Sequence, residues 1–169
     1  MSKVTNTVHD LGLGTWFGGS VFGILALNPA VEVLDDPEER GKMVDEGWAR
    51  FQPFGALGLF SAIIAHIIMR RNPPRRPSSS YKSTARIQDA FFGAAVVSSI
   101  ASLALGEYST HYDSPDAYTP MESATTPTED TPEPVEQAQK GLSVSSWAQL
   151  LSGLGIFITG AILAAEREK

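Results

Sequence analysis

The sequence predicts an all-α integral membrane protein: a four-helix bundle with a short amphipathic outer surface helix and a disordered acidic outer loop. Three observations support this fold class: four long runs without Lys, Arg, Asp or Glu, polar segments between them, and a one-sided distribution of positive charge. A bilayer core about 30 Å thick needs roughly 20 helical residues to cross it. The uncharged runs, of 21, 19, 17 and 25 residues, are Leu11–Val31, Phe51–Met69, Ala90–Gly106 and Gly141–Ala165.

These runs predict membrane spans near residues 8–31, 51–70, 86–106 and 142–165 of a single membrane domain covering residues 1–169. A soluble bundle is the alternative, but its helices would each show one apolar stripe and one charged face, whereas these runs are apolar all round. The first run is preceded by Lys3 alone, so it lacks the basic start of a signal peptide, and we interpret it as a retained span.

The charge distribution predicts the orientation. Loops that stay in the cytoplasm carry excess Lys and Arg, and the linker 71–85 with its flanks is strongly basic. Placing this linker inside also places both termini inside, with nine basic and four acidic residues on that face, against four basic and fifteen acidic outside. We therefore expect a multi-pass protein of the bacterial plasma membrane with cytoplasmic N and C termini. The linker is interpreted as a topology signal that contacts anionic lipid rather than nucleic acid.

The first outer segment predicts a short helix on the membrane surface. Asp36 is a suitable N-cap, Pro37 suits the first helical position, and Glu38 is an acid in the first turn, where the helix dipole favours it. Apolar residues recur at helical spacing from Met43 onward, and Trp48 among them is expected to anchor the helix at the interface. Pro53 is a possible kink where this helix runs into the second span.

The second outer segment, residues 107–141, is acidic and rich in Pro and Thr, with few large apolar side chains. Such a composition buries too little apolar surface to offset the entropy of ordering, so we expect a disordered loop that becomes helical near Pro134.

Glycines in the first span predict close helix packing. Gly14 with Gly18, and Gly19 with Gly23, form two small-xxx-small pairs, and glycine lets helix backbones approach closely in lipid. These glycines are interpreted as contacts inside the bundle, with homodimerisation through the first span as the alternative.

Two histidines, His9 and His66, are expected at similar depth near the cytoplasmic side, since their spans run antiparallel. Ionisable residues in a span are functional candidates, and this pair could ligate haem b or a metal, or relay a proton. The alternative is structural: His9 and Asp10 start a helix, and His66 bonds a serine across the bundle. Asp10 points about 100° away from His9 on a helix, so it is not expected to orient that ring, and His66 has no evident partner within its own turn.

The sequence predicts no enzyme. It has no cysteine, which excludes disulfides and thiolate chemistry, and it shows no Ser-His-Asp spacing, phosphate-binding loop or paired carboxylates within a span. We therefore expect a scaffold or accessory subunit of a membrane complex, without a cofactor, in contact with the lipid bilayer and with a membrane-protein partner or further copies of itself. The alternative is a haem- or metal-binding membrane protein that uses His9 and His66.

Several short runs carry a resemblance along nearly the whole chain. They are HDLGLGTWFGGS at 9–20, GWAR at 47–50, AH at 65–66, TPTEDTPEPVEQAQ at 126–139 and WA at 147–148. As a set they resemble a family of small, uncharacterised actinobacterial four-helix membrane proteins, which implies a plasma-membrane location and no particular activity. A weaker likeness, carried by His9, Trp16-Phe-Gly-Gly and Pro29, is to copper-resistance protein D-like membrane proteins; here the four methionines are scattered.

Overall fold

A computed structural model describes residues 3–115 and 117–167, and most of them are helical. Four helical stretches are long and apolar enough to cross a membrane, which confirms the predicted four-helix fold. The α-helices are α1 (Lys3–Phe22), α2 (Asn28–Ala30), α3 (Pro37–Arg71), α4 (Ser79–Thr110) and α5 (Glu133–Arg167). A π-helical turn, Gly23–Leu27, joins α1 to α2, and a 3-10 turn, Val31–Val33, follows α2, so the first stretch is helical from Lys3 to Val33.

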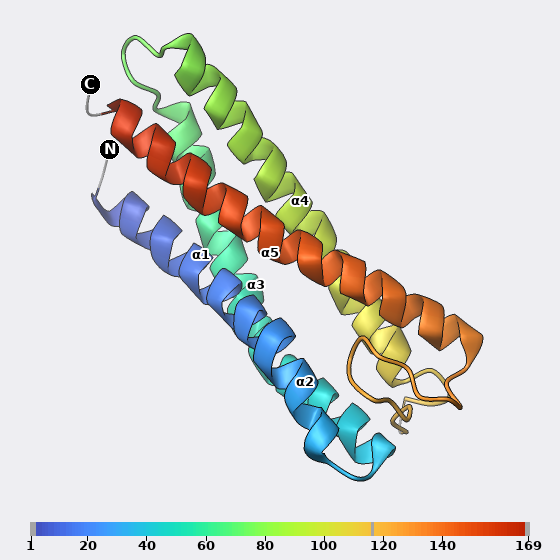
Figure 1. Ribbon diagram of the computed structural model, residues 1–169. Helices are drawn as coiled ribbons and strands as arrows, with labels where there is room; N and C mark the ends of the chain where they lie inside the picture. The colour runs from blue at the N-terminus through green and yellow to red at the C-terminus, as the bar shows by residue number, and fades with distance from the viewer. Residues whose placement is uncertain (1–2, 116, 168–169) are drawn as a thin grey trace.

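The bundle consists of two antiparallel helix pairs (Figure 1). α1 packs chiefly along α3, and α4 packs along α5, whereas α3 and α4 touch each other much less. We call one end the terminal end, because the first turn of α1, the last turn of α5 and the linker 72–78 lie there. We call the opposite end the acidic end; it holds the turn 31–36 and the segment 111–132.

Two buried apolar clusters hold the pairs together. The central cluster joins all four spans and contains Leu13, Trp16, Leu59, Ala62, Phe92, Ala95 and Ile156. The cap cluster lies at the acidic end and contains Val31, Val44, Met121, Ala124 and Leu142. Between the ends, large apolar side chains such as Leu57 (64% exposed) and Val97 (69% exposed) face outward, as they do where a helix meets lipid.

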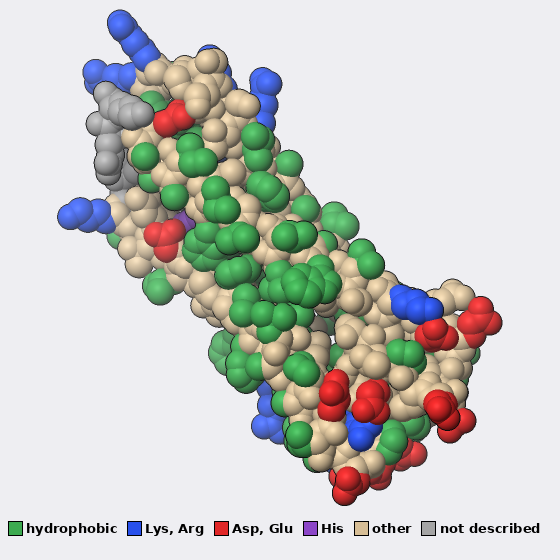
Figure 2. Space-filling model, in the orientation of Figure 1, with side chains coloured by type: hydrophobic (Ala, Val, Ile, Leu, Met, Phe, Trp, Pro, Cys, Tyr) green, Lys and Arg blue, Asp and Glu red, His purple; other side chains and the backbone are tan. Residues whose placement is uncertain are grey.

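Figure 2 shows how charge divides between the two ends on one face of the molecule. Hydrophobic side chains cover the middle, most of the Asp and Glu side chains gather at the acidic end, and Lys and Arg project from the terminal end.

The helix expected in the first outer segment is present and runs into the second span, as one continuous helix over residues 37–71, but it does not lie on a membrane surface. Its start follows the sequence: the Glu38 backbone N–H donates to Asp36 Oδ1 at 2.9 Å, and Pro37 occupies the first turn. The helix then continues through Pro53. The first part of this helix turns its apolar face toward the protein rather than toward a membrane surface, because Val44 is 5% exposed and belongs to the cap cluster.

The described residues of the segment 111–132 are folded rather than disordered. Met121 and Ala124 are 1% and 3% exposed and insert into the cap cluster. Its backbone is tied to the helices, since the Thr119 N–H donates to the Thr110 carbonyl at 2.8 Å and the Met121 N–H donates to the Pro37 carbonyl at 3.2 Å. The segment is held at both ends by long helices, which reduces the entropy of ordering that its composition alone would have to offset.

Candidate functional site

The terminal end holds a cluster of polar side chains that joins α3 to α4. His66 Nε2 donates to Asp89 Oδ1 at 2.7 Å, and Arg70 donates to both oxygens of the same carboxylate, from Nε at 3.0 Å and from Nη2 at 2.9 Å. His66 is 5% exposed, and its ring stacks on Phe92 of α4 with a centroid distance of 4.4 Å. The sequence prediction missed this partner because Asp89 lies 23 residues further along the chain, on another helix.

His9 of α1 also lies near Phe92, edge to face, with a distance of 6.0 Å between the two ring centroids. Its Nδ1 donates to Asp10 Oδ1 at 2.9 Å, so the expectation that Asp10 does not orient this ring is wrong. Adjacent residues diverge on a helix, but both side chains are long enough to turn back and meet. The Nε2 of His9 is buried and has no hydrogen-bond partner among the described residues.

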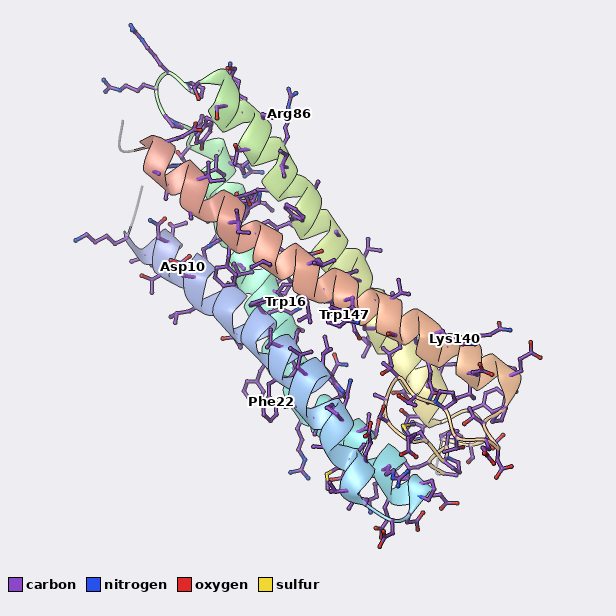
Figure 3. All side chains as sticks on the ribbon, viewed as in Figure 1. Asp10, Trp16, Phe22, Arg86, Lys140 and Trp147 are labelled. Carbon is purple, nitrogen blue, oxygen red and sulfur yellow. The ribbon has the colours of Figure 1, made fainter. Side chains whose placement is uncertain are left out.

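Both histidines line one pocket of about 610 Å³, as the sequence predicts from their common depth. The pocket also touches Gln88 and the last turn of α5. There Arg167 Nη2 donates to Tyr81 Oη at 2.7 Å and to the Met69 carbonyl at 3.2 Å. Figure 3 shows Asp10 on α1 in this end of the bundle. These bonds close the terminal end around the histidines and tie α3, α4 and α5 together.

The donor atoms do not fit axial ligation of one haem through both Nε2 atoms. His66 Nε2 is already bonded to Asp89, and the Phe92 ring fills space beside both imidazoles that a macrocycle between them would need. Within residues 3–115 and 117–167, no group of three or more His, Cys, Asp and Glu side chains is placed to hold a metal ion. His9 Nε2 is the one histidine nitrogen of the pair left buried without a partner in this described part of the chain.

The four packing glycines divide into two kinds. A Cβ at Gly19 would overlap the Phe51 ring and one at Gly23 would overlap the Trp48 ring, so both lie against α3. A Cβ at Gly14 or Gly18 would meet no described atom within 4 Å, so these two face away from the bundle. The backbones of α1 and α3 also approach closely at Gly12, where a Cβ would lie 2.5 Å from the Gly58 carbonyl oxygen.

Trp48 packs within the bundle rather than anchoring a surface helix. Its indole N–H donates to Asn28 Oδ1 at 2.8 Å, and Asn28 is 5% exposed. The ring meets Phe51 edge to face at a centroid distance of 6.1 Å. Since the indole N–H is satisfied by α2, Trp48 joins α2 to α3 below the acidic end.

The four apolar helices are those of a multi-pass membrane protein. Comparison with protein-family models, with curated proteins and with solved structures finds no match for the chain. The resemblance drawn from its short motifs therefore stays a prediction.

Proposed function

We propose that the protein is a non-enzymatic scaffold or accessory subunit of a membrane complex, and that its acidic end meets the partner. One observation carries this proposal: the acidic end is a folded surface rather than a flexible tail. Met121 and Ala124 fix segment 111–132 on the helices, and Arg40 forms an ion pair with Glu122 of that segment. A surface that is already held in one conformation loses less conformational entropy when it binds a partner.

The charge of this surface indicates the chemistry of the partner. Most of the basic side chains of this end are already engaged with acids: Arg40 pairs with Glu122, Arg50 with Glu46 and Lys140 with Glu136. The exposed carboxylates left over are those of Glu32, Asp35, Asp36, Glu38, Glu39, Glu107, Asp113, Glu129, Asp130 and Glu133. Such a field attracts a partner with a basic surface and repels an acidic one.

Purification from native membranes in a mild detergent, followed by mass spectrometry, tests this proposal. We expect a co-purifying protein that is lost when Glu32, Asp35, Glu129 and Asp130 are changed to their amides. The matched control exchanges Asp and Glu at the same four positions, which keeps the charge, and we expect it to retain the partner. A lone monomer from the wild-type chain, or equal retention by the amide variant, would contradict the proposal.

The orientation forms part of the same proposal: the terminal end lies in the cytoplasm of a bacterial plasma membrane and the acidic end lies outside. The excess of Lys and Arg at the terminal end supports it. Because the chain has no cysteine, single-cysteine variants can report accessibility. We expect Glu129→Cys, but not Ser79→Cys, to react with an impermeant thiol reagent in intact cells; the reverse pattern would overturn the orientation.

The alternative function, haem or metal binding by His9 and His66, has one observation in its favour, the unpartnered Nε2 of His9. The bond from His66 to Asp89 opposes it. We therefore expect protein purified from its native membrane to be colourless and to contain only substoichiometric metal. A Soret band that disappears in His66→Ala would establish the alternative and replace the accessory-subunit proposal with a redox role.

A further inference from the structure

A second cavity, of about 550 Å³, lies between the central cluster and the cap cluster. All four spans contribute to its lining, and Met121 and Ala124 close it at the acidic end. Leu59 and Trp16 of the central cluster close it toward the terminal end. Its volume falls within the range of about 300–1,000 Å³ that is usual for small-molecule sites.

The cavity opens sideways, between α3 and α4. Its exposed lining residues all come from these two helices: Ala49, Ala56 and Phe60 on α3, and Ile100, Leu103 and Glu107 on α4. Phe60 and Ile100 are 62% and 63% exposed, on the surface that a membrane protein presents to lipid. The weak contact between α3 and α4 leaves this opening, so a molecule dissolved in the bilayer can enter without passing through water.

The lining of the cavity includes polar, uncharged side chains. The Ser99 hydroxyl accepts from Trp16 Nε1 at 3.2 Å, and Asn28 Oδ1 accepts from Trp48 Nε1 at 2.8 Å. Among the described residues, no acceptor is found for the Ser99 O–H or for the Asn28 amide nitrogen, and the Ser146 hydroxyl, 5% exposed, has no bond. Two acceptors of this lining, Ser99 Oγ and Asn28 Oδ1, thus already receive an indole N–H, while the donors of Ser99, Asn28 and Ser146 remain free.

We infer that the cavity binds a neutral lipid whose polar head carries a carbonyl oxygen. The free donors of Ser99, Asn28 and Ser146 match such an acceptor, and a buried donor gains most from a partner that water cannot supply. The aliphatic part of the lipid leaves through the α3–α4 opening and lies along Phe60 and Ile100. Prenylquinones and diacylglycerols share this chemistry.

Charge at the opening excludes anionic lipids. Asp45 and Glu107 line the cavity toward the acidic end, where Asp45 Oδ1 lies 3.7 Å from His111 Nε2. A phosphate group placed beside two carboxylates would be repelled, whereas a neutral carbonyl head would not. The site therefore selects neutral lipids from a membrane rich in charged ones.

Tryptophan fluorescence tests this inference directly. Trp16 and Trp48 line the cavity, while Trp147, labelled with Trp16 in Figure 3, is 55% exposed and lies outside it. The full chain carrying Trp147→Phe is reconstituted in vesicles and titrated with three probes: decylubiquinone, dibrominated dioleoylglycerol and dibrominated phosphatidylglycerol. Quinones and bromine atoms quench an indole that they contact.

We expect saturable quenching by at least one of the two neutral probes and only a weak, linear background with phosphatidylglycerol. Saturation by the quinone alone identifies a prenylquinone as the ligand, and saturation by the glyceride alone identifies a diacylglycerol. Linear quenching by all three probes, or saturation by phosphatidylglycerol, would overturn the inference.

Two glycines of α4 provide a matched pair of variants. A Cβ at Gly106 or at Gly93 would meet no described atom within 4 Å, so both positions accept a larger side chain, but only Gly106 lines the cavity. We expect Gly106→Phe to abolish saturable quenching and Gly93→Phe to leave it unchanged. Ser99→Ala with Ser146→Ala should raise the dissociation constant of the neutral probe roughly tenfold. Unchanged saturation in Gly106→Phe would overturn the inference.

Discussion

Replacement of Gly12 by alanine is expected to cause a large loss of stability from a single methyl group. The new Cβ would lie 2.5 Å from the Gly58 carbonyl oxygen and 3.0 Å from the Ala62 backbone nitrogen. Both obstacles are backbone atoms of α3, so no side-chain rotation can relieve the clash, and α1 has to move away from α3. Overpacking of this kind costs about 1–3 kcal/mol, and we expect the loss in an SDS unfolding titration of the purified protein.

Gly14 provides the matched control on the same helix. It lies about half a turn away from Gly12, where a Cβ would meet no described atom within 4 Å. Alanine is favoured over glycine in a helix interior by about 0.5–1 kcal/mol, so Gly14→Ala should be neutral or slightly stabilising. Equal losses in Gly12→Ala and Gly14→Ala would show that α1 and α3 do not meet at Gly12.

The reciprocal position distinguishes a local contact from a general effect of substitution in α3. A Cβ at Gly58 would lie 2.7 Å from the Gly12 carbonyl oxygen, so Gly58→Ala should cause a loss similar to that of Gly12→Ala. Once either methyl group has separated the helices, the second meets less resistance. The double variant should therefore lose less than the two single losses added together.

The spans were predictable because each rests on a local property of the sequence. A long uncharged run has to satisfy its backbone by hydrogen bonding within one helix when it lies in lipid, and every predicted span falls within one of the helical stretches. The start of α3 was predictable for the same reason, because Asp36 caps the helix by accepting a hydrogen bond from Glu38, only two residues further along the chain. The four long apolar helices therefore followed from composition and short-range pattern.

Features that depend on contacts between distant residues were not predictable in this way. Asp89 is visible in the sequence as a charge at the edge of a span, but its bond to His66 depends on how α4 packs against α3. The same holds for the four glycines of the two small-xxx-small pairs. Their spacing is alike, yet of these four only Gly19 and Gly23 meet α3, and the spacing alone does not say which way each position faces.

The segment 111–132 shows the limit of arguing from composition. Few of its residues are apolar, which predicted disorder, but Met121 and Ala124 are placed where the two helix pairs leave an apolar gap at the acidic end. Two buried side chains are enough to order the segment when its two ends are held by helices and its backbone donates hydrogen bonds to the carbonyls of Thr110 and Pro37. The cavity followed from this closure, and no motif in the sequence indicated it.

Loss of the Asp89 carboxylate is expected to be the second large effect. In Asp89→Ala the His66 N–H stays buried without its acceptor, which costs about 1–3 kcal/mol. The Arg70 pair adds little, because the Arg70 and Asp89 side chains are 31% and 43% exposed and pairs of that kind contribute about 0–1 kcal/mol. Asp89→Asn keeps an oxygen for His66 and removes the charge, so it should lie between wild type and Asp89→Ala in the same SDS titration.

Asp10 serves as the matched control, because it is a carboxylate bonded to a histidine in the same way. Its side chain is 73% exposed, and its partner His9 is the adjacent residue, so the bond joins no second helix. Asp10→Ala should therefore change stability little. A double-mutant cycle of Asp89→Ala with His66→Ala should yield a coupling above the average of about 0.6 kcal/mol for hydrogen bonds between membrane helices and up to the maximum of about 1.7 kcal/mol. A coupling near zero, or equal losses for Asp10 and Asp89, would show that this bond does not hold α3 to α4.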